Sequence, residues 1–456
     1  MNIVILAAGQ GKRMYSALPK VLHPIAGKPM LGHVLDTVQK IDSKVKPCIV
    51  LGHGQEAVKA YLNKNHSNFT IAIQAEQKGT GHAVMQALPH LNEDLSTLIL
   101  YGDVPLIQAN TIKDLLRLAQ DETLVILTQK LENPTGYGRI VRSLDGEVTG
   151  IVEEKDASAE VKQVREINTG MMVCPTKELR QWLSQIQPNN AQGEYYLTDI
   201  VGLAAGQGVP IRTMMPKYGL EVEGVNSRVQ LAALERTWQS HQAEELLLKG
   251  VTLIDPQRID IRGDFNCSND VTIDIGCIFE GQVEIAGNVH IGPYCVIKDS
   301  KIGANSQIKA FSHLDGAVVG ESAVIGPYAR LRPGTEIDEQ AHIGNFVEVK
   351  NSRIGKGSKA NHLSYIGDAQ VGSRVNIGAG TITCNYDGVN KHQTIIEDGA
   401  FIGSDTQLVA PVTVGKGATI GAGTTLTKNA PEDKLTISRA KQLSVEWKRP
   451  PKKIIN

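Results

Sequence analysis

Between residues 273 and 426 one apolar side chain recurs at every sixth position, with small slips of register between runs. An α-helix repeats every 3.6 residues and a strand alternates every two, so neither element explains this period. The pattern predicts a coil of short flat sides, each with one inward side chain, and three sides complete one turn of a triangular prism. The inward positions are Ile273, Phe279, Ile285, Ile291, Ile297, Ile302, Ile308, Leu314, Ile325, Leu331, Ile337, Ile343, Val349, Ile396, Ile402, Leu408, Val414, Ile420 and Leu426.

Glycine follows many of the inward positions, as at Gly292, Gly303 and Gly403. We expect the chain to turn a corner there, because glycine tolerates backbone angles that other residues avoid. A β-sandwich also contains many short strands, but a strict phase of six over several runs disfavours it. The pattern resembles the hexapeptide repeat of left-handed parallel β-helices. Their handedness, an exception to the right-handed crossover rule, is implied by the resemblance alone.

The first 228 residues show a different pattern, in which continuous apolar runs alternate with amphipathic stretches. The runs predict strands at 2–8, 47–51, 69–74 and 97–103, and helices at 30–41 and 55–62. This order predicts an α/β, Rossmann-like domain with a mostly parallel sheet, in which ligands bind at the carboxyl ends of strands. Residues 227–250 form one long helical pattern that ends at Gly250. We therefore predict an α/β domain at 1–228, a linker helix at 229–250 and a β-helix domain with a C-terminal tail at 251–456.

Composition narrows the possible environments and partners of the chain. With 456 residues it is too long for one ordinary core, and a net charge of −1 offers no basic field for nucleic acid. The six cysteines are scattered without a C-x-x-C pair, which fits a reducing compartment better than a disulfide framework. The apolar run at the N-terminus is too short for a signal peptide, and no segment reaches the length of a membrane span. We expect a soluble, cytoplasmic protein.

A glycine-rich loop with basic residues follows the first predicted strand, over residues 9–14. Its backbone N–H groups can approach an anion closely, which favours phosphate binding over a plain turn between strand and helix. Met14 replaces the third glycine of a dinucleotide fingerprint, and no G-K-[ST] closes a P-loop. Lys20, directly after Pro19, can place a point charge on a phosphate, although a solvated surface lysine is also possible.

Polar groups follow two further strands. Residues 74–83 combine Gln74 with glycines before a helix, which suits recognition of a base edge. Asp103 ends another apolar strand, where a carboxylate near a phosphate loop is a hard oxygen ligand for Mg²⁺. The alternative is that Asp103 caps the next helix, but Pro105 delays that helix and favours the metal.

The segment 6–14, the pair Pro19-Lys20 and the triplet 101–103 together resemble the sugar-1-phosphate nucleotidylyltransferases. With the prism attached, the chain resembles, nearly end to end, a bacterial family of bifunctional enzymes. This family combines N-acetylglucosamine-1-phosphate uridylyltransferase with glucosamine-1-phosphate N-acetyltransferase. Further matching motifs lie at 74–81, 137–140, 153, 168–170, 193–196 and 223–226.

The resemblance implies roles for residues of the first domain. The nucleotide would be held by Leu6, Ala7, Ala8 and Gly9, and the uracil would be read by Gln74, Gly79 and Thr80. The sugar would be held by Tyr101, Gly138, Glu153 and Asn168, and Gly102 would also contact UTP or UDP-N-acetylglucosamine. Asp103 and Asn226 would bind Mg²⁺, and Arg13 and Lys20 would be catalytic. In this chemistry a sugar phosphate oxygen attacks the α-phosphorus of UTP and pyrophosphate leaves. Such transfer needs positioning and charge neutralisation rather than a protein nucleophile.

Two irregularities interrupt the six-residue ladder, at residues 359–365 and at an insertion over 383–394. Loops on a rigid solenoid are where function is expected. His362, in the first, can act as a general base at neutral pH, although an exposed corner histidine is nearly as plausible from the residues alone. Some prism proteins bind zinc through histidines of several subunits, but none of the prism histidines here forms the H-x₄-H pair of such sites.

The resemblance favours acetyl transfer at this second site. It implies that His362 deprotonates the amine of glucosamine-1-phosphate, which Arg332, Lys350, Tyr365 and Asn376 would bind, and that acetyl-CoA lies along Ala379, Asn385, Tyr386, Ser404, Ala422 and Arg439. Asn361 stands where many relatives have glycine, and asparagine tolerates left-handed angles better than most residues. The family forms homotrimers with sites between subunits.

The sequence therefore predicts an enzyme with two sites and small-molecule substrates, using Mg²⁺, UTP and acetyl-CoA. It would acetylate glucosamine-1-phosphate and then form UDP-N-acetylglucosamine for peptidoglycan and lipopolysaccharide. One alternative is a nucleotidylyltransferase for another sugar whose prism only mediates oligomerisation. A second is a non-catalytic scaffold with a relic nucleotide fold.

Overall fold

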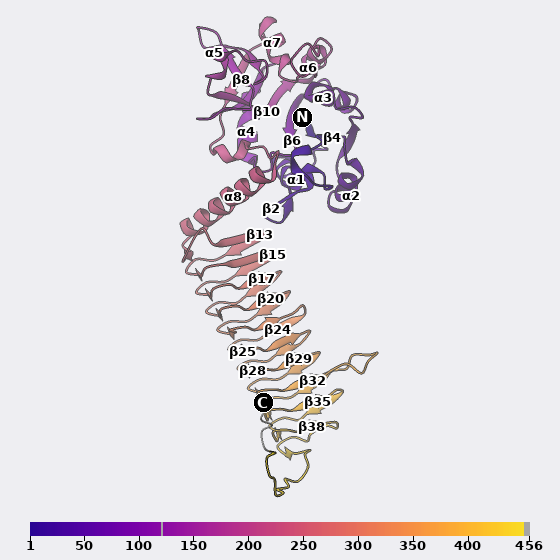
Figure 1. Cartoon of the computed structure of the whole chain (residues 1–456), viewed down its shortest axis with the longest axis vertical. Helices are drawn as coiled ribbons and strands as arrows, with labels where there is room; N and C mark the ends of the chain where they lie inside the picture. The colour runs from indigo at the N-terminus through magenta and orange to yellow at the C-terminus, as the bar shows by residue number, and fades with distance from the viewer. Residues whose placement is uncertain (120–121, 451–456) are drawn as a thin grey trace, which may run out of the picture. The chain divides into compact units, whose positions relative to one another are not determined.

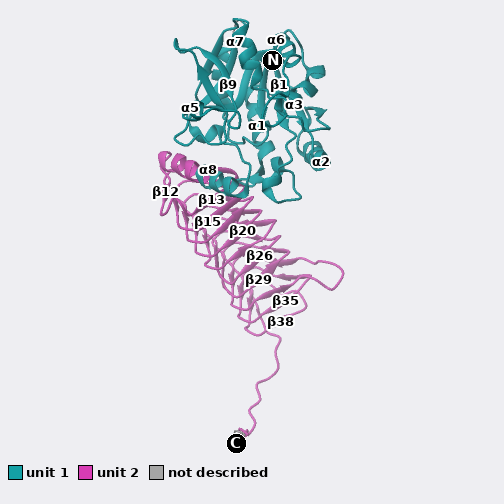
Figure 2. Cartoon of the chain, turned by 45° about the horizontal axis from the view of Figure 1, so that its top comes forward, with its two compact units in different colours: residues 1–238 teal, residues 239–456 magenta. Residues whose placement is uncertain are grey.

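The computed structural model describes residues 1–119 and 122–450 and forms two compact units, divided between Trp238 and Gln239 (Figure 2). The division falls inside helix α8 (Arg228–Leu248), the helix predicted at 227–250. The domain limits predicted at residues 228 and 250 stay predictions.

The first unit is built on a mostly parallel sheet with β1 (Asn2–Ala7) in its interior. The strand order is β11 (Ile211–Met214), β7 (Leu124–Lys130), β10 (Glu166–Pro175), β6 (Ser96–Tyr101), β1, β4 (Cys48–Leu51) and β5 (Thr70–Ile73). Only β10 runs antiparallel to its neighbours on this path, and the pair β8 (Arg139–Arg142) and β9 (Val148–Val152) attaches to it. The predicted α/β class is confirmed.

Both faces of this sheet are covered, which explains why its strands read as continuous apolar runs. Val4 and Leu6 of β1 pack in the core that contains α3 (Thr80–Ala87), α6 (Thr176–Leu183) and α7 (Asp199–Gly206). Ile3 and Ile5 point the other way, into the core that contains α1 (Met30–Ile41), α2 (Gln55–Asn65) and α4 (Ala109–Leu118). Successive side chains of a strand alternate between faces, so one run of aliphatic residues supplies two cores.

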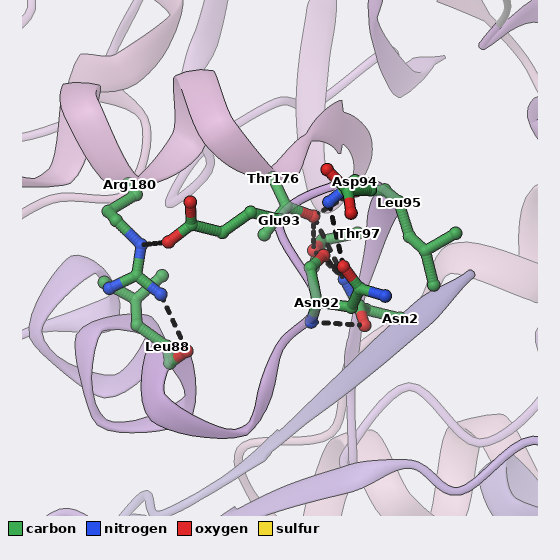
Figure 3. A network of polar contacts seen from close by, with 9 residues as sticks. All are labelled: Asn2, Leu88, Asn92, Glu93, Asp94, Leu95, Thr97, Thr176 and Arg180. Atoms are coloured by element: carbon green, nitrogen blue, oxygen red, sulfur yellow. Dashed lines mark hydrogen bonds and ion pairs between the residues drawn. The ribbon is translucent and has the colours of Figure 1, made fainter.

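The chain leaves β1 toward β4 and β5 on one side and returns to β6 on the other. Such a reversal of strand order opens a crevice at the carboxyl ends of β1 and β6, where ligands of open α/β sheets bind. At the opposite end a polar network ties the starts of these strands to the end of β10 (Figure 3). Asn2 donates from Nδ2 to the Asn92 carbonyl at 2.8 Å and to Thr176 Oγ1 at 3.1 Å. Thr97 Oγ1 lies 2.6 Å from Thr176 Oγ1.

The second unit is a parallel β-helix, whose stacked coils are visible in Figure 1. One ladder contains β16 (His290–Ile291), β19 (Gln307–Ile308), β22 (Val324–Ile325), β25 (His342–Asn345), β28 (Lys359–His362), β31 (Asn376–Ile377), β34 (Phe401–Ile402) and β37 (Thr419–Ile420). A second contains β17 (Val296–Lys298), β20 (His313–Asp315), β23 (Arg330–Leu331), β26 (Glu348–Lys350), β29 (Tyr365–Gly367), β32 (Ile382–Cys384), β35 (Gln407–Val409) and β38 (Thr425–Leu426). A third contains β18 (Lys301–Ile302), β21 (Ala317–Val319), β24 (Thr335–Ile337), β27 (Arg353–Ile354), β30 (Ala369–Val371), β33 (Thr394–Ile396) and β36 (Val412–Val414). Three ladders of this kind confirm the triangular coil.

The inward positions predicted from the period of six are confirmed. Their side chains form one continuous core and none is more than 3% exposed. Burial of each aliphatic side chain is worth roughly 1.5–3 kcal/mol, and each coil depends on its neighbours to complete that burial. Coils are 17 residues apart at Ile291 and Ile308 but 25 apart at Ile377 and Ile402. The extra residues form the loop that projects between β32 and β33 (Figures 1 and 2).

The reason predicted for the glycines after the inward positions was wrong in most coils. The backbone does not adopt positive φ at Gly292, Gly303 or Gly403. The left-handed corners are instead formed by residues such as Tyr294 and Asn305, with φ of 57° and 60°. Glycine is needed because neighbouring coils approach closely. A Cβ at Gly292 would lie 2.8 Å from the nitrogen of the next coil's Ala310, and Gly303 is equally confined.

Within the described residues, no helix combines the length and the apolar character that a bilayer crossing requires.

Candidate active sites

A cavity of about 240 Å³ opens at the carboxyl ends of β1 and β6, where the sheet topology predicts a ligand. Among its lining residues are ten that the sequence proposed for the nucleotide, the sugar, Mg²⁺ or catalysis: Leu6, Ala7, Ala8, Gly9, Lys20, Gln74, Gly79, Thr80, Tyr101 and Asp103. Val21, Gln77, Ala83 and Glu194 complete the wall and were not proposed. The fold therefore brings the three loops after β1, β5 and β6 to one cavity.

The glycine-rich loop is shaped by its contact with Lys20. Gly11 adopts φ 61°, and a Cβ there would lie 2.8 Å from Lys20 Cβ. Gly9 is less confined, and a Cβ there would lie 3.9 Å from Lys20 Nζ. Gly102 donates its N–H to the Leu6 carbonyl at 2.9 Å, which joins the ends of β6 and β1. Small residues in this loop thus allow the lysine side chain to run beneath it toward the cavity.

Lys20 brings together the two residues proposed as metal ligands. Its ammonium donates to Asp103 Oδ2 and to Asn226 Oδ1, the latter at 3.0 Å. The side chains of Lys20 and Asp103 are only 11% and 16% exposed, so this contact is well shielded from water. Val225 N donates to the Asp103 carbonyl at 3.0 Å, which holds Asn226 next to the aspartate. Two side-chain oxygens therefore converge on the Lys20 ammonium, which belongs to the cavity wall.

The loop proposed to read uracil is fixed by internal hydrogen bonds. Buried Gln74 donates from Nε2 to the Gly79 carbonyl at 3.0 Å. Gly79 adopts φ 106°, and a Cβ there would lie 2.5 Å from the Tyr195 carbonyl oxygen. Thr80 Oγ1 accepts from Leu197 N at 3.0 Å. The loop is held open toward the cavity by a segment more than 100 residues later in the chain.

The residues proposed for the sugar also lie together. Asn168 N donates to the Gly138 carbonyl at 2.8 Å, and a Cβ at Gly138 would lie 3.2 Å from Glu153 Oε1. Burial raises the pKa of Glu153. Burial, with the nearby charge of Glu153, also raises the pKa of Tyr101, which remains a neutral hydrogen-bonding group at neutral pH. This cluster adjoins the cavity through Tyr101.

Arg13 is the one proposed catalytic residue of the first unit that lies apart from the cavity. It belongs to a short 3₁₀ turn, Lys12–Met14, and its side chain is exposed. Among residues 1–119 and 122–450 it has no hydrogen-bond or ion-pair partner for its guanidinium. Its role in phosphoryl transfer stays a prediction.

The second candidate site surrounds His362, at the end of β28. His362 and Asn345 occupy the same register position in neighbouring coils, and His362 Nδ1 lies 3.0 Å from Asn345 Oδ1. An amide oxygen can only accept, so Nδ1 carries the proton and the exposed Nε2 keeps its lone pair. Asn345 was not found from the sequence, although its spacing of one coil before His362 is a usable signal.

Cations gather on the adjoining face of the β-helix. Arg332 donates to Glu348 Oε1 at 2.8 Å, while Lys350 lies beside Lys391 of the insertion. The contact with Lys391, and less strongly the charge of Arg332, lowers the pKa of Lys350. Lys391 was not found from the sequence, because it belongs to the insertion and follows no period. Tyr365 lies against Gly367, where any Cβ would overlap its ring.

The residues proposed for acetyl-CoA continue the same edge of the β-helix beyond His362. Asp405 N donates to the Ala379 carbonyl at 2.7 Å and Gly423 N to the Ser404 carbonyl at 2.8 Å, so these small residues stack coil upon coil. Arg439 donates to the Ala422 carbonyl at 2.6 Å. Asn385 and Tyr386 lie at the start of the insertion; Asn385 donates to Asp368, and the Tyr386 hydroxyl to the Gly388 carbonyl. Asn376, which was proposed for the sugar phosphate, lies on β31 and pairs with Lys359 of the preceding coil.

Comparison with known proteins agrees with the two-unit organisation. The MobA-like NTP transferase domain matches residues 3–185, and the bacterial transferase hexapeptide family matches 316–351 and 393–428. The chain is 59% identical to bifunctional protein GlmU of Herminiimonas arsenicoxydans and 60% identical to that of Janthinobacterium sp. (strain Marseille). Each likeness covers 99% of both chains. A solved UDP-glucose pyrophosphorylase in complex with UDP-glucose is 17% identical over 52% of this chain and 97% of its own, with a TM-score of 0.45.

Proposed function

The chain belongs to the family of bifunctional GlmU proteins, and from that premise we propose that it carries two transferase activities on one polypeptide. The β-helix unit acetylates glucosamine-1-phosphate with acetyl-CoA. The α/β unit then transfers UMP from UTP to N-acetylglucosamine-1-phosphate, which yields UDP-N-acetylglucosamine and pyrophosphate for peptidoglycan and lipopolysaccharide. The observation that carries the proposal is the presence of two separate clusters, one around Lys20 and Asp103 and one around His362.

The uridylyl site fits a divalent cation. Asp103 and Asn226 offer two hard oxygens that already share one ammonium, and Mg²⁺ is commonly bound by few protein oxygens together with waters and phosphates. Within the described residues no group of three or more His, Cys, Asp or Glu side chains is placed to hold a metal ion. When bound, Mg²⁺ would neutralise phosphate charge at this point.

The other residues of the cavity perform binding and orientation. Backbone N–H groups of the loop after β1 approach the phosphates, and Lys20 supplies positive charge beside them. Gln74, Gly79 and Thr80 orient the base, while Glu153 and Asn168 orient the sugar. The sugar phosphate oxygen then meets the α-phosphorus of UTP in line, and no protein group becomes covalently attached.

At the second site His362 acts as general base. The amine of glucosamine-1-phosphate attacks the thioester carbonyl, so a C–N bond forms and the C–S bond breaks. His362 Nε2 accepts the amine proton, which passes to the departing CoA sulfur. Asn345 keeps the imidazole in the tautomer that this step requires. Arg332, Lys350 and Lys391 lie where the sugar phosphate would relieve their mutual repulsion.

The proposal includes a homotrimer formed through the β-helix. Tyr294, Phe311, Tyr328 and Phe346 form a ridge along one edge, stacked at centroid distances of 5.4, 4.9 and 5.4 Å. Each of these rings is about half exposed, and Leu363, next to His362, continues the ridge. An exposed apolar ridge favours coverage by another chain. Mass measurement of the native protein and of a Phe311→Ser/Tyr328→Ser variant tests whether the ridge forms the trimer interface. An unchanged trimer in the variant would exclude the ridge as that interface.

The proposed location is the cytoplasm. All six cysteines are free thiols, which suits a reducing compartment.

Two assays on the purified chain test the function. Pyrophosphate release from UTP and N-acetylglucosamine-1-phosphate measures the first activity, and thiol release from acetyl-CoA and glucosamine-1-phosphate measures the second. We expect both. Pyrophosphate release without thiol release would favour the single-activity alternative, and neither release would favour the scaffold.

A further inference from the structure

We propose that Thr198 is a positioning residue for sugar recognition, and that residues 194–198 join the base-reading loop to the sugar-binding carboxylate as one unit. The inference rests on the uridylyltransferase function proposed above. It assigns a role to a segment that the catalytic scheme leaves unused.

One end of this segment is bonded to the base-reading loop. Tyr195 N donates to the Lys78 carbonyl at 2.8 Å, and Gly81 N donates to the Tyr195 carbonyl at 2.8 Å. Leu197 N donates to Thr80 Oγ1 at 3.0 Å. The segment thus pairs with the loop as a short strand would, and Gly79 is the residue that permits the close approach.

The next residue along the segment reaches the sugar end. Thr198 Oγ1 donates to Glu153 Oε1 at 3.0 Å, and both side chains are largely buried. Within residues 1–119 and 122–450 this hydroxyl is the only side-chain donor to the Glu153 carboxylate. Adjacent residues therefore contact the loop for the base and the carboxylate for the sugar.

The preceding stretch strengthens the attachment to the loop after β9. Ala191 N donates to Asp156 Oδ1 at 2.8 Å, and Lys155 Nζ donates to Gln192 Oε1 at 2.6 Å. Segment 190–198 is therefore bonded both to the base-reading loop and to the loop after β9, and displacement of one end would strain the other.

A packing role alone does not explain the hydroxyl of Thr198. This residue precedes α7 at the N-cap position, where a threonine side chain commonly bonds the helix backbone. Its side chain makes no such capping bond here. Removal of the hydroxyl therefore leaves the helix start intact and affects Glu153 alone.

The charges around Glu153 set the direction of the pH effect. Burial raises the pKa of Glu153, the Thr198 hydroxyl opposes this, Asp199 and Asp156 raise it further, and Arg139 lowers it. Tyr101 also faces the carboxylate. Loss of the hydroxyl removes a donor that favours the ionised form, so the pKa of Glu153 rises and the carboxylate is lost at a higher pH.

The test uses the full chain, UTP, N-acetylglucosamine-1-phosphate and pyrophosphate release over a range of pH. We expect Thr198→Val to raise the KM for the sugar phosphate about tenfold, to change the KM for UTP little, and to move the acid limb of kcat/KM to higher pH. Thr198→Ser keeps the hydroxyl and should behave as the parent. Thr149→Val, on the exposed face of β9, is the matched control.

A double-mutant cycle with Glu153→Ala, which removes the acceptor of the Thr198 hydroxyl, separates the positioning role from a general loss of stability. Thr198→Val should add nothing to the sugar KM once the carboxylate is gone. An additive effect, an unmoved acid limb, or a serine variant that behaves like valine would overturn the positioning role. Absence of pyrophosphate release by the parent would instead overturn the proposed function.

Discussion

The two candidate sites differ in how their charges are balanced within one chain. In the α/β unit, Lys20 is shielded from water and contacts Asp103 and Asn226. On the β-helix, Lys350 faces another lysine, Lys391, and His362 is exposed at an edge. A cavity made by loops of a single unit can balance its own charge, whereas a site on a flat repeat leaves positive charge that a ligand or another copy must balance. This difference predicts which changes separate the two activities.

The largest separation is expected from His362→Ala. Loss of the general base should lower thiol release from acetyl-CoA by about 10²–10⁴ while pyrophosphate release stays at the parental rate. His290→Ala, an exposed histidine on the same ladder, is the control and should change neither rate. Equal loss of both activities would show that the sites are not independent.

Asp103→Ala should produce the opposite separation, by about 10²–10³ in pyrophosphate release. The change removes one of two convergent oxygens and leaves the buried Lys20 ammonium without its carboxylate. The Mg²⁺ concentration needed for half-maximal rate should rise, and thiol release should be unaffected. Asp94→Ala, at an exposed aspartate, is the control. Unchanged dependence on Mg²⁺ in Asp103→Ala would show that Asp103 is not a metal ligand.

The regular features of the fold were predictable because they repeat. The inward aliphatic residues of the β-helix follow from a period of six, and the central strands follow from runs buried on both faces. The close approach of neighbouring coils could not be predicted from the repeat in the same way. Gly292 was attributed to backbone angle, whereas the approach of Ala310 in the next coil is the reason for it.

Site residues were predictable where they belong to a motif, and less so where their role depends on a distant contact. The loops at 6–9, 74–80 and 101–103 meet at one cavity because they follow parallel strands. Asn345 acts through a histidine one coil away, and Thr198 acts through Glu153 on another loop. The Thr198 contact has no signature within its own segment, whereas the Asn345 contact is signalled only by its spacing of one coil before His362.

A smaller effect is expected from Asn345→Leu, which leaves His362 in place. The imidazole would lose the acceptor that fixes its tautomer, so thiol release should fall about ten- to a hundredfold. Asn345→Asp keeps an acceptor oxygen and should retain most of the rate. Pyrophosphate release from the same preparation reports whether the protein is folded. If the leucine variant acetylates at the parental rate, the hydrogen bond to Asn345 is not needed for catalysis.

The smallest effect is expected from Lys391→Ala, and it tests whether the unbalanced charge on the β-helix has a function. Loss of one exposed cation should raise the KM for glucosamine-1-phosphate only about two- to fivefold, and less in high salt. The direction in which the pKa of Lys350 changes follows from its neighbour Lys391. Lys391 lowers the pKa of Lys350, so its removal raises that pKa, and Lys350 stays charged to higher pH.

The alkaline limb of kcat/KM for glucosamine-1-phosphate should therefore move upward in Lys391→Ala, although the phosphate is bound more weakly. Lys356→Ala, whose ammonium pairs with Glu339, is the control and should shift neither quantity. A limb that stays in place would mean that Lys350 does not sense Lys391. A KM that is insensitive to salt would mean that the cluster does not bind the phosphate. A simple loss of folding cannot combine weaker binding of the phosphate with an alkaline limb at higher pH.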